Sequence, residues 1–287
     1  MYRSNNILAL IPPDGDGKKI LNQALFFQEN LGMRIFILNI IDKPSMFKRL
    51  FFPEKVQNLK KEALRIQQEF VIKAIGSDIP RNLAIRVKAG NPLKVLLAQS
   101  KNGGYEFMII DKSHSPGSLI RYETDKIISR SYCPVMTINK DYPIKEIKKI
   151  IIPVDISQAT KKKLLWATYF AKKFEAKITI VSALNINLSS RRSLAWRNAE
   201  KLKYMLHQRG VDCEVEILKT TSKEKHKVIY EYIKKEQPGM VIIRTHQESN
   251  MSGTQIGKFV SEIVHNCKMP VFTVNRFLYP MPVDFEY

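Results

Sequence analysis

The sequence predicts an α/β protein built from two similar domains, each a parallel β-sheet with helices on both faces. Three observations lead to this prediction: short apolar runs alternate with helical patterns, the runs are apolar throughout, and the second half of the chain repeats the first. Alternation of this kind is typical of βαβ units. Strands without polar residues, such as III at 150–152 and MVII at 240–243, are expected where helices cover both sides of a sheet.

The internal repeat is visible at the beginning, middle and end of each half. The matching segments are NILALIPPDGD (6–16) with KIIIPVDIS (149–157) at an offset of 143 residues, FMIID (107–111) with MVIIR (240–244), and PVMTIN (134–139) with PVFTVN (270–275). Two copies of one domain explain this self-similarity. The predicted organisation is a first domain at 1–140, a linker at 141–146, a second domain at 147–275 and a C-terminal tail at 276–287.

Each copy is expected to contain five strands and four helices, because apolar runs and helical patterns follow one another in that number. In the first copy the strands are expected at 6–12, 34–41, 83–88, 106–111 and 134–138, and the helices at 17–31, 54–75, 92–102 and 121–131. In the second copy the strands are expected at 148–154, 177–183, 212–217, 239–243 and 270–274, and the helices at 158–174, 190–208, 224–236 and 255–266.

Length and composition favour ordinary globular domains. The chain has 287 residues, of which 44% are hydrophobic and 26% charged, which is enough for two cores. No apolar stretch approaches the ~18 residues of a membrane span and the first residues do not form a signal peptide, so we expect a cytoplasmic protein. The three cysteines form no CxxC pair and no disulfide framework, and they are expected to be buried thiols.

The formal net charge of +20 raises the question of nucleic-acid binding. Residues 1–143 hold 22 Lys and Arg against 13 Asp and Glu, and residues 144–287 hold 25 against 14, so the excess is spread over both halves. Basic residues do not alternate with stacking aromatics as they do in single-strand binders. We therefore expect no nucleic-acid partner.

Several motifs together carry a resemblance to a known family. They are IIIPVDIS (150–157) followed by a helix that ends in KKFEAKITIV (172–181), GNPLKVL (90–96), and the closing strands after Cys133-Pro134 and Met269-Pro270. Both copies resemble universal stress protein domains, and the chain resembles the tandem two-domain members. The resemblance implies the adenine-nucleotide alpha-hydrolase-like fold, an open five-stranded parallel sheet with strand order 3-2-1-4-5. Ligand-binding members hold ATP at the carboxyl ends of the strands.

In those members an aspartate closes strand 1, and strand 4 is followed by Gly, two residues, Gly, nine residues and Gly-Ser/Thr. In the second copy, Asp155 matches the aspartate and Gly257 matches the last glycine, whereas Arg244, Gln247 and Lys258 stand at the two earlier glycines and at the Ser/Thr. The glycines let the backbone approach phosphate, so a long side chain takes up space that the triphosphate needs. Against this, cationic side chains can still bind an anion by charge.

The first copy departs further from the same pattern. Pro12 stands at the aspartate position, and the loop after strand 4 reads DKSHSPGSLIR (111–121), three residues shorter than its counterpart. Asp111, at the start of that loop, would repel a phosphate group unless a metal ion intervened. The first copy is therefore expected to be a scaffold.

Two functions of different classes remain open. The first is a non-enzymatic tandem stress protein with eroded ATP-binding motifs, without catalytic residues, metal or cofactor, which binds an unknown protein partner or a second copy of itself. The second is a nucleotide-binding switch for ATP or AMP in the second copy, with slow ATP hydrolysis. Its residues would be Asp155 and Ala183 near the base and ribose, and Gly257, Lys258 and Thr245 at the phosphates.

Other chemistry finds little support in the sequence. The five histidines lack metal-ligand spacing and are expected to be solvated, and no G-x-S-x-G motif indicates a nucleophile. Two aromatic segments, 45–55 and 276–287, are expected to pack against their own chain. A partner or membrane-surface contact is the alternative for the first, and a dimer contact for the second.

Overall fold

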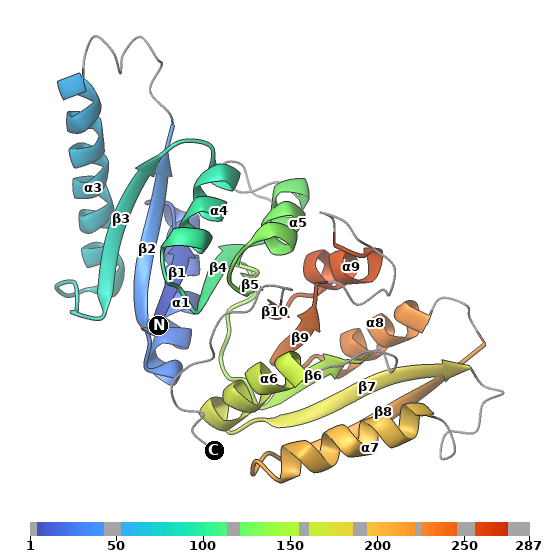
Figure 1. Cartoon of the computed structure of the whole chain (residues 1–287). Helices are drawn as coiled ribbons and strands as arrows, with labels where there is room; N and C mark the ends of the chain where they lie inside the picture. Colours follow the sequence, from blue (N-terminus) through green and yellow to red (C-terminus); the bar gives the residue numbers. More distant parts are fainter. Residues whose placement is uncertain are drawn as a thin grey trace. The chain divides into compact units, whose positions relative to one another are not determined.

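The computed structural model divides into two compact units, unit 1 (Met1–Pro143) and unit 2 (Ile144–Tyr287). The structure describes residues 5–42, 53–113, 121–154, 161–185, 194–221, 225–245 and 256–274. In each unit, parallel strands form a sheet and helices cover its faces (Figure 1).

Unit 1 alternates strands and helices along the chain. Its elements are β1 (Asn6–Leu10), α1 (Gly15–Leu31), β2 (Arg34–Ile41), α3 (Pro53–Ile75), β3 (Leu83–Ala89), α4 (Pro92–Asn102), β4 (Phe107–Asp111), α5 (Arg121–Arg130) and β5 (Val135–Ile138). The strand order is β3-β2-β1-β4-β5. Ile7 on β1 pairs with Ile35 on β2 and with Phe107 on β4, which places β1 at the centre of the sheet.

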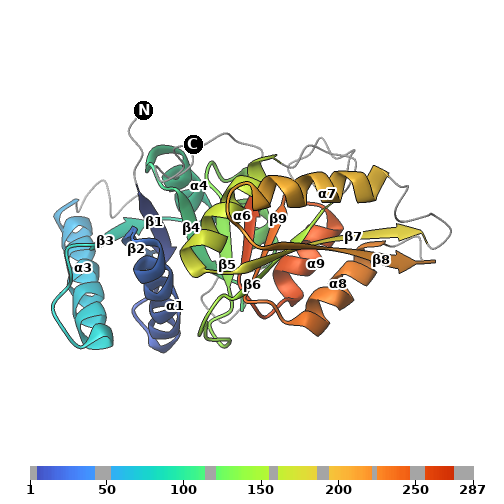
Figure 2. The same ribbon diagram turned by 90° about the horizontal axis from the view of Figure 1, so that it is seen from below.

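Unit 2 repeats this arrangement. Its elements are β6 (Lys149–Pro153), α6 (Lys161–Phe174), β7 (Lys177–Asn185), α7 (Leu194–His207), β8 (Cys213–Thr220), α8 (Lys225–Glu236), β9 (Met240–Arg244), α9 (Lys258–Asn266) and β10 (Val271–Val274). The strand order is β8-β7-β6-β9-β10, with parallel pairing throughout. Helices α6 and α7 lie on one face of the sheet, and α8 and α9 on the other (Figure 2).

The predicted α/β fold and its 3-2-1-4-5 strand order are confirmed, and the ends of some elements differ. Strand β1 ends at Leu10 because Pro12 has no N–H to continue the ladder. Helix α1 begins at Gly15, two residues early, because the Asp14 carboxylate caps it by accepting from the Gly17 N–H at 2.7 Å. Strand β8 continues to Thr220 alongside the longer β7. The expected helical residues 158–160, 190–193, 224 and 255 lie outside the described part.

The central strands of both units are buried apart from some of their end residues. In unit 1 the core includes Phe27 on α1 and Phe107 on β4, both without solvent exposure. In unit 2 the Trp166 ring on α6 lies with its centroid 5.6 Å from Phe170 and 5.0 Å from Phe272 on β10. Aromatic rings at these separations stabilise a core beyond the area that they bury. The aromatic cluster thus ties α6 to the sheet of unit 2.

Two further predictions concern the cysteines, expected to be buried thiols, and the lack of a membrane span. Cys133, Cys213 and Cys267 are buried thiols, as predicted. Among the helices that the structure describes, none combines the length and the apolar character that crossing a bilayer requires.

Candidate functional site

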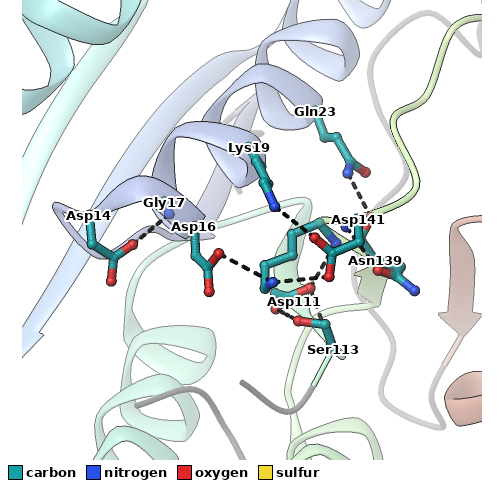
Figure 3. Close-up of polar contacts among 10 residues, drawn as sticks. Asp14, Asp16, Gly17, Lys19, Gln23, Asp111, Ser113, Asn139 and Asp141 are labelled. Atoms are coloured by element: carbon teal, nitrogen blue, oxygen red, sulfur yellow. Dashed lines mark hydrogen bonds and ion pairs between the residues drawn. The ribbon is translucent and has the colours of Figure 1, made fainter. Parts of the chain in front are cut away.

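In a parallel sheet of this kind ligands bind at the carboxyl ends of the strands, beside the point where the strand order reverses. In unit 1 that point lies between β1 and β4. It is surrounded by the first turn of α1, by Asp111 at the end of β4, and by residues 139–141 directly after β5 (Figure 3). Because all three strands run in the same direction, segments far apart in sequence meet at this edge.

Lys140 is the centre of the polar contacts at the edge of unit 1. Its Nζ lies 3.0 Å from Asp141 Oδ2 and 3.2 Å from Asp16 Oδ1, and only 8% of the side chain is exposed. The hydrogen bond to Asp141, followed by the one to Asp16, raises the pKa of Lys140 above its ordinary value. The ammonium group is thus charged and directed at carboxylates of its own unit.

Asp141 is held from two sides. Its Oδ1 lies 2.8 Å from Lys19 Nζ on α1, and this pair is about half exposed to solvent. The hydrogen bond from Lys19, followed by the one from Lys140, lowers the pKa of the Asp141 carboxyl. Exposed pairs such as Lys19 with Asp141 contribute about 0–1 kcal/mol to stability.

Asp111 is buried, and its carboxylate accepts hydrogen bonds from Ser113 and Lys140. Oδ1 accepts from the backbone N–H of Lys140 at 3.0 Å and from that of Ser113 at 3.3 Å, and Oδ2 accepts from the Ser113 hydroxyl. The residue is 6% exposed. The position that we predicted to repel phosphate therefore carries a carboxylate that is already saturated with local donors.

Pro12, at the position of the family aspartate, lies against the start of α1. A Cβ added to Gly17 would lie 1.8 Å from the carbonyl oxygen of Pro12, so the helix can approach this turn only with glycine there. Pro12 offers a ligand neither a carboxylate nor an N–H. Beside it, the Gln67 amide on α3 donates to the Ile11 carbonyl at 3.2 Å. The carboxyl end of β1 is thus enclosed by the start of α1 at Gly17 and by Gln67 of α3.

The predicted residues of unit 2 are only partly described. Ala183 is buried on β7, where it pairs with Leu218 on β8. Arg244 is the last residue of β9, half-buried and in register with Val274. Asp155 and Gln247 lie outside the described residues, as do His114, His246, residues 45–52 of the first aromatic segment and the whole of 276–287.

Thr245 directly follows β9 and has a hydroxyl without a partner. Its backbone N–H donates to Val274 O at 3.1 Å, as that of Lys112 in unit 1 donates to Ile138 O at 2.9 Å, so the two positions are equivalent. The Thr245 side chain has no solvent exposure, and its Oγ1 has no hydrogen-bond partner among the residues that the structure describes. Leaving a buried hydroxyl unpaired costs about 1–3 kcal/mol.

The N-terminus of α9 lies at the same edge, since this helix connects the end of β9 to the start of β10. Gly257 is its N-cap, with φ −63° and ψ 154°, and no side chain caps the helix. Lys258 is exposed at the first helical position. An uncapped helix N-terminus next to a cation favours an anion.

His226 was not singled out from the sequence, and it is half-buried, so the expectation of solvated histidines holds for it only in part. It lies in the first turn of α8, with its ring centroid 6.1 Å from that of Phe259 in the first turn of α9. Its Nε2 is buried without a hydrogen-bond partner. Nothing in the motif spacing indicates this, because the burial arises from the packing of α8 against α9.

The acidic and basic residues at the edge of unit 1 were also not predicted as a group. Lys140 and Asp141 are neighbours in the sequence, but only the fold brings Asp16 on α1 to Lys140. Within the described ranges, no group of three or more His, Cys, Asp or Glu side chains could hold a metal ion.

Comparisons with known proteins agree with this architecture. Residues 146–275 match the model of the universal stress protein family. No curated protein matches the chain. Among solved structures, a universal stress protein from Archaeoglobus fulgidus DSM 4304 is similar at a TM-score of 0.70 and 16% identity, covering 96% of this chain and 100% of its own.

Two structures from Pseudomonas aeruginosa are also similar over both units. One is a putative universal stress protein from strain UCBPP-PA14, with a TM-score of 0.59, 16% identity, and 94% and 93% of the two chains covered. The other is a functionally unknown protein from strain PAO1, with a TM-score of 0.59, 15% identity, and 94% and 92% covered. Unit 2 thus carries the match to the universal stress protein family, and the chain as a whole has the fold of these two-unit structures.

Proposed function

We propose that this chain is a non-enzymatic stress protein that binds a protein partner in the cytoplasm, with unit 1 as its scaffold. The observation that supports this most is the closed polar edge of unit 1. Lys140 is directed at Asp16 and Asp141, and the Asp111 carboxylate is saturated by Lys140 and Ser113. Among the described residues of this edge, a phosphate group would meet the carboxylates of Asp16, Asp111 and Asp141, and the ammonium groups of Lys19 and Lys140 already pair with carboxylates.

Unit 2 supports the same proposal through Arg244. The resemblance places this long side chain at a glycine position of the phosphate loop, and the structure has it half-buried at the end of β9. The backbone cannot approach a triphosphate as closely there as it does beside glycine. A protein that has lost nucleotide binding would function through contacts of its surface with a partner, and not through a reaction.

The binding partner is proposed to be another protein or a second copy of this chain. Sedimentation velocity at micromolar concentration separates the two, because a second copy changes the sedimentation coefficient of the purified protein alone. If the purified chain is monomeric, the partner is a different protein.

A nucleotide-binding switch in unit 2 is the second candidate, and Thr245 favours it. A buried hydroxyl without a partner, next to an uncapped helix N-terminus with an exposed lysine, is an arrangement that an anionic ligand would complete. In this candidate ATP or AMP binds at Asp155, Ala183, Thr245, Gly257 and Lys258, with slow hydrolysis of ATP.

Isothermal titration calorimetry with ATP and with AMP, in the presence of Mg²⁺, distinguishes the two candidates. A ligand at 100 times its dissociation constant also stabilises the protein by about 2.7 kcal/mol, which calorimetric unfolding detects. If the first candidate is correct, millimolar nucleotide gives no heat of binding and no stabilisation, and phosphate release does not exceed background. Micromolar binding that is lost in Asp155→Ala would overturn it.

The control variant for that experiment is Asp212→Ala. Asp212 is exposed and precedes β8, at the opposite edge of the unit 2 sheet, where only its backbone carbonyl bonds to Ile178. The substitution is chemically the same and removes the same charge. Binding that falls equally in both variants reflects net charge and not a site.

A further inference from the structure

The segment that leads out of unit 1 is bonded more tightly than a connecting turn requires. We propose that residues 139–141 form a strap that occupies the ligand edge of unit 1 from within the chain, and that Lys140 holds the strap closed. This inference concerns a conformational device and does not depend on whether unit 2 binds a nucleotide.

Each residue of the strap is held by an element far away in the sequence. The Gln23 amide on α1 donates to the Asn139 carbonyl at 2.7 Å, and Asp111 on β4 accepts from the Lys140 N–H at 3.0 Å. Lys19 Nζ lies 2.8 Å from Asp141 Oδ1. Figure 3 shows these contacts converging from α1 and β4 on the segment after β5.

The strap also has an internal structure. The Asp141 N–H donates to the Asn139 side-chain oxygen at 2.9 Å, and the Tyr142 N–H donates to the Asn139 carbonyl at 3.0 Å. Asparagine at the first position of a tight turn is typical of such bonds. The backbone is therefore folded into a turn and directed into the edge, where it fills the space between α1 and the end of β4.

Lys140 differs from Lys19 in the exposure of its side chain, which is 8% for Lys140 and 52% for Lys19. The carboxylates that Lys140 contacts are open to solvent, with Asp16 40% and Asp141 54% exposed. Salt and water therefore screen all of these pairs in part, and the Lys140 pairs less than the Lys19 pair. The groups that face the ammonium are Asp16 from α1 and Asp141 from the strap itself.

Opening of the strap would separate Lys140 from Asp16 and Asp111, and Asp141 from Lys19, whereas the Lys140–Asp141 pair would move with the strap. Opening would free residues 139–141 from unit 1 and uncover the carboxyl ends of β1 and β4. Chain that is now part of unit 1 would then extend the connection that follows Pro143. The strap would thus couple the closure of the unit 1 edge to the length of the segment that follows unit 1.

Hydrogen–deuterium exchange of the full chain, read at the amides of residues 140, 141 and 142, tests the proposal, since the first bonds to Asp111 outside the strap and the other two bond to Asn139 within it. In Lys140→Met we expect these amides to exchange roughly tenfold faster or more, while β1 and β4 stay protected. Lys140→Arg keeps the charge and Lys19→Met removes only the exposed pair, so both should change exchange by less than about threefold.

Asp16→Asn gives an independent test from α1, because it weakens the same ion pair without altering the strap. It should also accelerate exchange at the same amides, to a smaller degree than Lys140→Met. Unchanged exchange in both variants would show that backbone bonds alone hold the strap. Loss of protection throughout unit 1 in both would show that the cluster stabilises the fold and is no local closure. Either result overturns the proposal.

Discussion

Thr245 donates its backbone N–H to the carbonyl oxygen of Val274 over 3.1 Å, while its own buried hydroxyl has no hydrogen-bond partner in the described part of the chain. Valine has nearly the same shape and no hydroxyl. Thr245→Val should therefore raise the free energy of unfolding of the ligand-free protein by about 1 kcal/mol, since an unpaired buried group is removed. Urea unfolding followed by circular dichroism measures this change.

The control for Thr245→Val is Thr168→Val on α6. Thr168 is equally buried, but its hydroxyl donates to the Leu164 carbonyl at 2.8 Å. The same substitution there should lower stability by about 1 kcal/mol, because a hydrogen bond is lost. Equal effects of the two substitutions would contradict the difference between the two hydroxyl groups.

Gly17→Ala should destabilise unit 1 by about 1–3 kcal/mol, because the new methyl group overlaps the Pro12 carbonyl and α1 must shift. Gly15, in the same turn of the same helix, has open space around it. Gly15→Ala should be neutral or stabilising by up to about 1 kcal/mol. Comparing the urea midpoints of the two variants tests the close approach of α1 to the Pro12 carbonyl.

Asp111→Ala should cost about 2–4 kcal/mol, because the buried N–H of Lys140 and the donors of Ser113 lose their acceptor. Asp111→Asn keeps one carbonyl oxygen and should cost less. Thermal unfolding by calorimetry gives both values. A fully neutral Asp111→Ala would mean that water replaces the carboxylate at this edge.

Two thiols should be unreactive in the native protein. Burial raises the pKa of both Cys133 and Cys213 to about 12, so at pH 8 about one thiol in ten thousand is ionised. An alkylating reagent should therefore label both cysteines only after unfolding, as peptide mass spectrometry can show. Reactivity should rise as the pH increases toward 12, because the thiolate is the nucleophile. Rapid native labelling of Cys133 at pH 8 would contradict its burial.

The fold could be predicted because its determinants are local in the sequence. Apolar runs such as 150–152 predict strands buried on both faces, and the repeat shows that one topology occurs twice. The ends of elements were less predictable. The start of α1 depends on a cap from Asp14 and the end of β1 on Pro12, and these act through geometry over two or three residues.

The site was less predictable, since its groups meet only in the folded chain. Family spacing predicts Gly257 and Arg244 as motif positions, and it carries no information on Lys140, which meets Asp16 from a distant helix. The unpaired hydroxyl of Thr245 is a property of what surrounds it, as is the buried Nε2 of His226. Residue type and spacing cannot report that a partner is missing.

The aromatic cluster around Trp166 has a practical consequence. The chain has two tryptophans, Trp166 and Trp196, and both belong to unit 2. Because Trp166 is enclosed by Phe170 and Phe272, its emission wavelength reports the integrity of that core. Intrinsic fluorescence excited at the indole band therefore follows the melting of one half of the molecule, and ellipticity follows both. The natural sequence thus carries its own optical label for asking whether the halves unfold together.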